Sequence, residues 1–102
     1  MSADAFHAAL RIDAAHPALA GHFPGRPVVP GVVLLERVAA ACKAWRGVRI
    51  ARLDAKFLRP LQPDEDAAIE LRGGESGRLR FSVTGADGAA VARGTLETAS
   101  RV

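Results

Sequence analysis

Apolar and polar residues alternate along five stretches of the chain, and a period of two predicts half-buried β-strands. The clearest stretch is residues 78–84, where Leu79, Phe81 and Val83 alternate with polar residues. The dipeptides Gly73-Gly74 and Asp87-Gly88 predict hairpin turns before and after this strand. The predicted strands comprise residues 6–13, 48–58, 66–72, 78–84 and about 89–98.

Between the first two strands the pattern changes. Residues 14–30 show no period and carry four prolines, which predicts a long and rigid loop. The chain from Gly31 to about Trp45 has no internal proline or glycine and is long enough for a helix, and Gly47 follows where a left-handed C-terminal residue is expected. This helix is apolar almost all round, so we expect it to be covered on most sides.

The predicted order is therefore strand, long loop, helix and then four strands in a meander. An antiparallel sheet of about five strands wrapped around one central helix satisfies this pattern, and it is the α+β architecture called the hotdog fold. Phe57 and Phe81 are expected in its core. One such sheet cannot cover the helix fully, so we expect a dimer of single domains comprising residues 1–102.

Composition narrows the class of protein. The chain has 102 residues, the size of one domain, and no apolar run reaches the roughly 18 residues typical of a membrane span. No signal peptide is evident, and a single cysteine suits a reducing cytoplasm. The net charge of +3 favours an acidic partner. The absence of tyrosine and of a basic-aromatic stripe argues against a nucleic-acid-binding protein.

The candidate chemistry lies in the stretch GHFPGRPVVPG and the helix that follows it. A neutral imidazole at His22 can accept a proton near pH 7. A carboxyl group at Glu36 within an apolar helix would have a raised pKa and could donate one. The free amides of Gly31 or Val32 at the helix start could polarise a carbonyl oxygen. Together these groups suit the elimination of water from a β-hydroxy carbonyl compound.

Simpler interpretations stand beside this one. A lone loop histidine is more often exposed to solvent than catalytic. Glu36 shares a helix face with Ala40 and Lys43, so this face could be the wetter side of the helix. Cys42 is interpreted as a small core residue. The chain contains neither HExxH nor paired CxxC spacing, so no metal site is expected.

The combined string GHFPGRPVVPGVVLLE closely resembles the active-site segment of the β-hydroxyacyl-acyl-carrier-protein dehydratases, whose pattern is HFPGxPxxPGVLxxE. His22 and Glu36 have the fourteen-position separation of that pattern. A second segment, KFLRPLQPD at residues 56–64, resembles the family's KFxRPVxPGD strand and turn. In the weaker form of a shared order of strands, the resemblance covers nearly the whole chain.

This resemblance implies a homodimer with active sites at its interface, supplied by the histidine of one subunit and the acid of the other. It implies that His22 removes the α-proton of a (3R)-hydroxyacyl thioester on an acyl carrier protein, and that Glu36 assists departure of the 3-hydroxyl group as water. The amide of Gly31 would hold the thioester carbonyl, with Phe23, Pro30 and Val32 beside the substrate. No cofactor and no metal are implied.

Some positions depart from the family pattern. Ala40 stands where the family often has glutamine, which could alter how the acid is positioned. Pro63-Asp64-Glu65 replaces the usual Pro-Gly-Asp of the turn. The chain is shorter than the housekeeping enzymes, and the segment HPALAGHFPGRPVVPGVVLLERV is similar to the short dehydratases of aryl polyene pigment clusters. That similarity implies a growing polyene chain as substrate, where the housekeeping enzymes of fatty acid biosynthesis take a saturated one.

Three further hypotheses remain open. Acyl carrier proteins are acidic, so basic residues could form a docking surface, or they could be ordinary solvated charges. The same pocket could hydrolyse the thioester, as hotdog thioesterases do, or the chain could be a non-catalytic partner of another subunit. The docking candidates are Arg26, Arg46, Arg49, Arg52, Lys56 and Arg59, of which Arg26 is preferred because it lies in the active-site loop.

Overall fold

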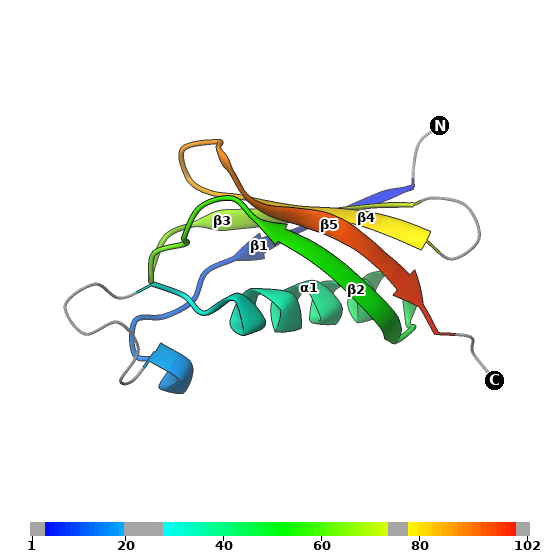
Figure 1. Ribbon diagram of the computed structural model, residues 1–102, viewed down its shortest axis with the longest axis horizontal. Helices are drawn as coiled ribbons and strands as arrows, with labels where there is room; N and C mark the ends of the chain where they lie inside the picture. The colour runs from blue at the N-terminus through cyan, green and yellow to red at the C-terminus, as the bar shows by residue number, and fades with distance from the viewer. Residues whose placement is uncertain (1–3, 20–27, 74–77, 100–102) are drawn as a thin grey trace.

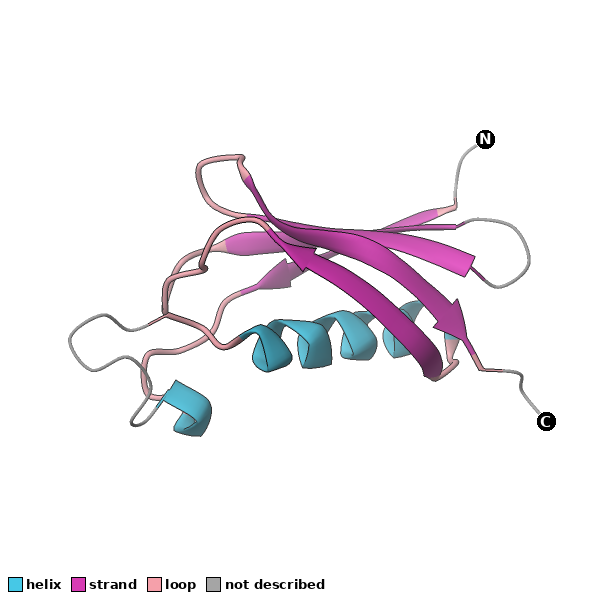
Figure 2. Ribbon diagram, in the orientation of Figure 1, coloured by secondary structure: helices cyan, strands magenta, loops and turns pink. Residues whose placement is uncertain are grey.

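The computed structural model describes residues 4–19, 28–73 and 78–99, and they form one curved sheet against one helix (Figure 1). The helix lies along one face of the sheet, and the other face carries no helix (Figure 2). Within the described residues, no helix is both long and apolar enough to cross a membrane. The elements in chain order are β1 (Ala5–Leu10), the 3₁₀ turn η1 (Pro17–Leu19), α1 (Gly31–Arg46), β2 (Ile50–Phe57), β3 (Ala67–Gly73), β4 (Arg78–Thr84) and β5 (Ala90–Thr98).

All five strands pair antiparallel in the order β1-β3-β4-β5-β2. The predicted four-strand meander is therefore right for β3 to β5 and wrong for β2. The place beside β3 is taken by β1, so the chain after β2 crosses from one side of the sheet to the other before β3 begins. Close approach of β2 to β5 requires Gly94, because a Cβ at that position would lie 1.9 Å from the carbonyl oxygen of Asp54.

The helix α1 ends as the sequence predicts. Gly47 has a left-handed φ of 69°, and its amide donates a hydrogen bond to the carbonyl of Lys43 at 2.8 Å. Only one side of the helix is buried, however, so the expectation that it is covered on most sides is not met within a single chain. The buried helical residues are Val33, Leu34, Val38, Ala41 and Cys42.

The core lies between this buried side of α1 and the inner face of the sheet. Ile69, Leu71, Leu79, Phe81 and Val83 alternate inward along β3 and β4, as their period of two predicts. Among the described residues no polar or charged side chain is fully buried. The interpretation of Cys42 as a core residue is confirmed, because it is fully buried and burial raises the pKa of its thiol.

Phe57 corrects the expectation that it belongs to this core. Its side chain points to the inner side of β2, but β2 is the outermost strand and the ring stays 50% exposed. Leu58, which follows it, is 41% exposed. The alternation along β2 thus identifies the inner face correctly, but it does not reveal that little of this chain covers that edge.

Candidate active site

The predicted site residues divide between described and undescribed parts of the chain. Pro30, Gly31 and Val32 begin α1, and Glu36 lies in its second turn. His22 and Phe23 lie outside the described residues, as does Arg26. The structure therefore brings together the helix start and its surroundings, and the predicted base of the loop remains a prediction from sequence.

The start of α1 is left without a side-chain cap. Pro30 precedes the helix in an extended conformation, and among the described residues no side-chain cap accepts a hydrogen bond from the first turn. The amide of Val33 donates to the carbonyl of Pro30 at 3.0 Å, whereas the first amides of any α-helix lack a partner within the helix itself. These amides, together with the helix dipole, favour an electronegative atom at this point.

A pocket of about 610 Å³ opens beside the helix start. The ring of Phe57 forms one wall and lies so close to Gly31 that a Cβ there would stand 2.8 Å from Cζ of the ring. The approach to the helix is held in place because the amide of Val29 donates to the carbonyl of Leu61 at 2.9 Å. The pocket is mostly apolar and is lined by Val28, Val29, Pro30, Gly31, Leu34, Phe57, Leu58, Arg59, Pro60 and Leu61.

Glu36 does not line this pocket. Its side chain is exposed on the outer side of α1, together with Ala40 and Lys43, so the interpretation of this face as the wetter side is confirmed for the single chain. The expected burial of the carboxyl group is not found there. Val32 lies on the same outer side and is 62% exposed. Gly31 and Glu36 thus lie on different faces of one helix.

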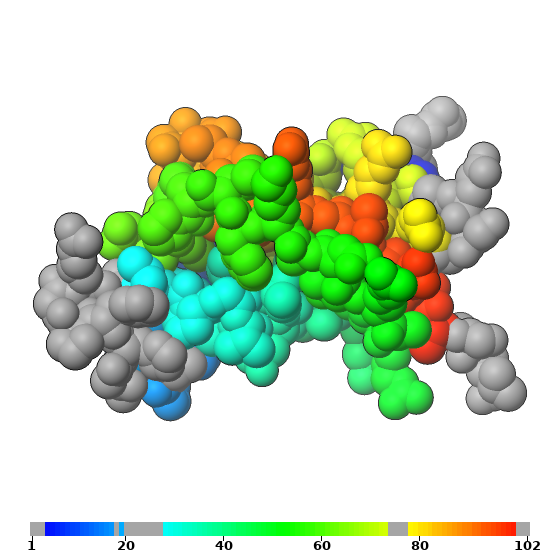
Figure 3. All heavy atoms as spheres, viewed as in Figure 1, coloured from blue at the N-terminus to red at the C-terminus, as the bar shows by residue number. Residues whose placement is uncertain are grey.

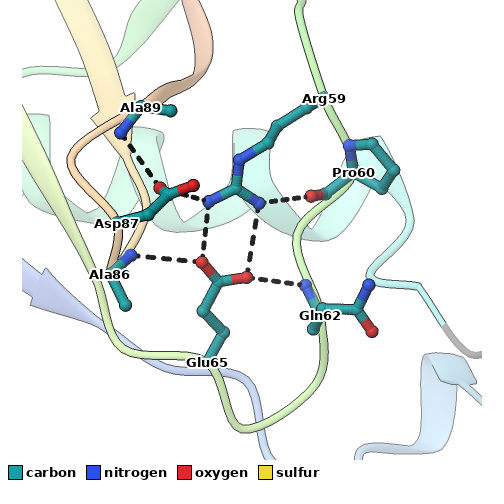
Figure 4. Close-up of polar contacts among 7 residues, drawn as sticks. All are labelled: Arg59, Pro60, Gln62, Glu65, Ala86, Asp87 and Ala89. Atoms are coloured by element: carbon teal, nitrogen blue, oxygen red, sulfur yellow. Dashed lines mark hydrogen bonds and ion pairs between the residues drawn. The ribbon is translucent and has the colours of Figure 1, made fainter.

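The segment that carries the pocket wall is fixed by a network around Arg59 (Figure 4). Its guanidinium donates to Glu65 through Nη2 at 2.8 Å and to Asp87 through Nη2 at 2.9 Å. Nη1 donates to the carbonyl of Pro60 at 2.8 Å. Because Asp87 lies in the β4–β5 turn, these contacts connect the segment after β2 to the β4–β5 hairpin. We call Arg59, Glu65 and Asp87 the Arg59 network.

The charges of this network stabilise one another. Hydrogen bonding from Arg59 lowers the pKa of Glu65 from 4.5 to about 2, and the amides of Gln62 and Ala86 act in the same direction. The amide of Ala89, followed by Arg59, lowers the pKa of Asp87. The pKa of Arg59 is raised, chiefly by its hydrogen bond to Glu65. Sequence reasoning missed this network, although the segment RPLQPDE at residues 59–65 places Arg59 and Glu65 within one turn.

The basic residues considered for docking are used in different ways. Arg46 pairs with Asp4 and lies 4.1 Å over the ring of Trp45. Arg52 pairs with Asp54 at 3.1 Å. Arg59 belongs to the Arg59 network. Arg49 and Lys56 take part in none of the ion pairs found among the described residues, which leaves them available to a partner.

Comparison with known proteins supports the same group of enzymes. The model of the family described as ApeI-like, ApeI dehydratase, matches residues 1–95. The chain is 34% identical over 99 residues to the 3-hydroxyacyl-[acyl-carrier-protein] dehydratase FabZ of Pasteurella multocida. That match covers 83% of this chain and 65% of the relative, so this chain spans less than two thirds of the relative's length.

Solved structures confirm the hotdog fold. The dehydratase heterocomplex ApeI:P from Xenorhabdus doucetiae superposes with a TM-score of 0.82 at 22% identity, covering 95% of this chain and 88% of that one. A 1,4-dihydroxy-2-naphthoyl-CoA thioesterase from Synechocystis has a TM-score of 0.69 at 14% identity, with 90% and 78% covered. At such identities these likenesses establish the fold alone, and the same fold carries both chemistries.

Proposed function

This chain belongs to the ApeI-like dehydratase family, and from that premise we propose that it eliminates water from a (3R)-3-hydroxyacyl thioester carried by an acyl carrier protein. The product is a trans-2-enoyl thioester. The observation that carries the proposal is the uncapped helix start at Gly31, which opens into a mostly apolar pocket of about 610 Å³. An amide donor beside an apolar chamber suits a thioester attached to an acyl chain.

Each residue has a defined part in this reaction. The neutral imidazole of His22 accepts the proton from the carbon next to the thioester carbonyl, and the amide of Gly31 stabilises the negative charge that develops on the carbonyl oxygen. The carboxyl group of Glu36 donates a proton to the 3-hydroxyl group, which leaves as water. His22 then holds one proton more and Glu36 one fewer, and return of that proton completes the cycle without a cofactor.

The active site is proposed to form between two subunits. Within one chain Gly31 lines the pocket and Glu36 faces away from it, which supports Glu36 acting in the site of another subunit. The outer side of α1, which carries Glu36, would then be covered by the second subunit. The apolar surface for this association is offered by the exposed side chains of Val32, Phe57 and Leu58. The free edge of β2 lies beside it and could pair with another strand.

The partner subunit is proposed to be a second copy of this chain. The Xenorhabdus doucetiae relative is a heterocomplex, so a different hotdog chain is the alternative to be tested. The acidic carrier protein is expected to approach the mouth of the pocket, and Arg26 stays the preferred contact. Fatty acid or aryl polyene biosynthesis in the cytoplasm is the proposed setting, and the acyl chain would be a growing polyene in the second case.

One assay tests the reaction. The purified protein is given a (3R)-hydroxyacyl thioester on carrier protein and on a short pantetheine mimic, while enoyl formation and free thiol are followed together. Enoyl product without thiol supports the dehydratase. Release of thiol identifies a thioesterase that uses the same pocket. Formation of neither product, by the chain alone and with carrier-bound substrate, contradicts the proposed activity and leaves a non-catalytic partner.

A further inference from the structure

The outer face of the sheet, away from α1, carries a second hollow of about 550 Å³. Figure 3 shows side chains of β4 and β5, in yellow and orange, standing up from the side of the sheet opposite the helix. This hollow shares no lining residue with the pocket beside Gly31. Its outward-facing lining residues are Asp54, Lys56, Glu70, Arg72, Arg80, Ser82, Arg93 and Thr95.

The centre of this surface is a block of four side chains on β4 and β5. Arg80 lies opposite Thr95, and Ser82 lies opposite Arg93. Two guanidinium groups therefore alternate with two hydroxyl groups at the corners of one block on a single face. Each of these side chains can donate hydrogen bonds outward, and together they offer both charge and directed donors.

The fold leaves the cations of this block uncompensated. Arg80 lies directly opposite Arg72 on β3, and Arg93 lies directly opposite Lys56 on β2. Like charges placed directly opposite one another on neighbouring strands are destabilising. Arg80, Arg93 and Lys56 take part in no ion pair found among the described residues. An anionic ligand on this face would supply the missing opposite charge.

Cations elsewhere on the same face are compensated. Arg78 pairs with Glu97 at 2.9 Å, and Arg52 pairs with Asp54 at 3.1 Å. The two carboxylates that line the hollow are likewise engaged. Glu70 accepts hydrogen bonds from Arg72 at 2.9 Å and pairs with His7 at 3.0 Å, while Asp54 is held by Arg52. Neither carboxylate makes an ion pair with the central arginines.

We propose that this hollow binds a soluble small molecule that carries phosphate, held by the guanidinium groups of Arg80 and Arg93 and by the hydroxyl groups of Ser82 and Thr95. Guanidinium forks match the oxygens of a phosphate group, and charge-assisted hydrogen bonds of this kind are about twice as strong as neutral ones. The volume falls within the range typical of small-molecule sites, about 300–1,000 Å³. The site lies apart from the proposed catalytic pocket and does not depend on the proposed function.

The direct test is calorimetric titration of the full-length protein with inorganic pyrophosphate at low ionic strength. Saturable binding is expected, with affinity reduced at least tenfold in Arg80→Gln and in Arg93→Gln. Arg78→Gln is the matched control, because Arg78 lies on the same strand and face but outside the hollow. It should change the affinity less than twofold. Absence of saturable binding, or an equal loss in the control, overturns the proposal.

Thermal unfolding gives an independent readout. Without pyrophosphate, Arg80→Gln should unfold at the same temperature as the wild type or higher, because it relieves a like-charge contact. With pyrophosphate, the wild type should gain stability and the variant should not. A lower unfolding temperature of the ligand-free variant would assign Arg80 a structural role and contradict the proposal. Arg80→Lys, which keeps the charge but loses the fork, should retain intermediate affinity.

The dehydratase assay separates a small-molecule site from a protein-docking surface. Arg80→Gln should leave the turnover of carrier-bound substrate unchanged. If pyrophosphate does not bind and the KM for carrier-bound substrate rises instead, the surface binds an acidic protein and the proposal is wrong.

Discussion

The aromatic ring of Phe57 rests against the backbone of Gly31, with three ring atoms within 3.2 Å of the place where a Cβ would lie. The contact joins the last residue of β2 to the first residue of α1. It closes one wall of the pocket over the helix amides. Any side chain at position 31 must displace this ring.

Gly31→Ala should therefore impair activity more than stability. Because the Phe57 ring is half exposed, it can move aside, and alanine also favours the helix by up to about 1 kcal/mol. We expect the free energy of unfolding to change by less than about 1 kcal/mol and kcat/KM to fall at least tenfold, because the methyl group and the displaced ring crowd the pocket. Chemical denaturation and the enoyl assay measure the two quantities.

The double variant Gly31→Ala/Phe57→Leu provides the control. If the ring mediates the effect, the smaller side chain should recover part of the lost activity, and the two substitutions should not be additive. Additive losses would show that Phe57 does not transmit the effect of the methyl group.

His22→Ala and Glu36→Gln should each reduce kcat by roughly 10²–10⁴-fold, the usual contribution of a positioned acid or base. Both variants should still fold and dimerise, so that the loss of activity reports on the reaction itself. A fully active His22→Ala variant would contradict the proposed mechanism. The measurement is the rate of enoyl formation at saturating substrate.

Mixing the two inactive variants tests whether a site is shared between subunits. Random exchange makes half of the dimers mixed, and each mixed dimer holds one site with both residues intact, so about a quarter of the wild-type activity should return. If His22 and Glu36 act within the same subunit, mixing restores nothing. Unmixed preparations of each variant, treated in the same way, are the controls.

Val32→Lys should weaken dimerisation. Val32 is 62% exposed, and a lysine there would carry charge into the proposed interface, where an unpaired cation is costly. Sedimentation should show a shift toward monomer. Ala9→Lys is the matched control, because Ala9 is also exposed but lies on β1, at the opposite edge of the sheet. An unchanged dimer in Val32→Lys would exclude this side of α1 from the interface.

The Arg59 network should make stability depend on pH in the acid range. The folded-state pKa of Glu65 is about 2, below its ordinary value of 4.5. The unfolded chain therefore takes up a proton first as pH falls, so the stabilisation is fully present above about pH 4.5 and is lost between there and about pH 2. Glu65→Gln should flatten this dependence and destabilise the protein by about 1.5–3 kcal/mol at neutral pH. If the variant unfolds in acid with the same pH dependence as the wild type, the prediction is wrong.

The sequence predicts local structure well because the alternation of apolar residues, and the glycines and prolines that end an element, are local signals. The bounds of β4 and the end of α1 at Gly47 follow from the alternation of Leu79, Phe81 and Val83 and from one glycine. The position of β2 does not follow, because strand order depends on which edge a strand reaches. Period alone cannot distinguish a central strand from an edge strand, and for this reason it predicts Phe57 in the core.

The candidate site shows the same division. The helix start and its uncapped amides are predictable from Pro30 and Gly31. The Arg59 network is not, because Asp87 meets Arg59 only through the pairing of β2 with β5, which brings the end of β2 beside the β4–β5 turn. The exposed position of Glu36 has a different cause. The helix pattern alone does not say whether this chain or a second subunit covers that face.

The sheet order also bears on how the protein is made. β1 pairs with β3, so His7 meets a residue 63 positions later. β2 has β5, the last of the described strands, as its neighbour in the sheet. A nascent chain on the ribosome therefore holds β2 without a neighbouring strand until β5 has been synthesised. Such non-local pairing slows folding. A chain that is truncated before β5 should therefore aggregate unless chaperones bind it.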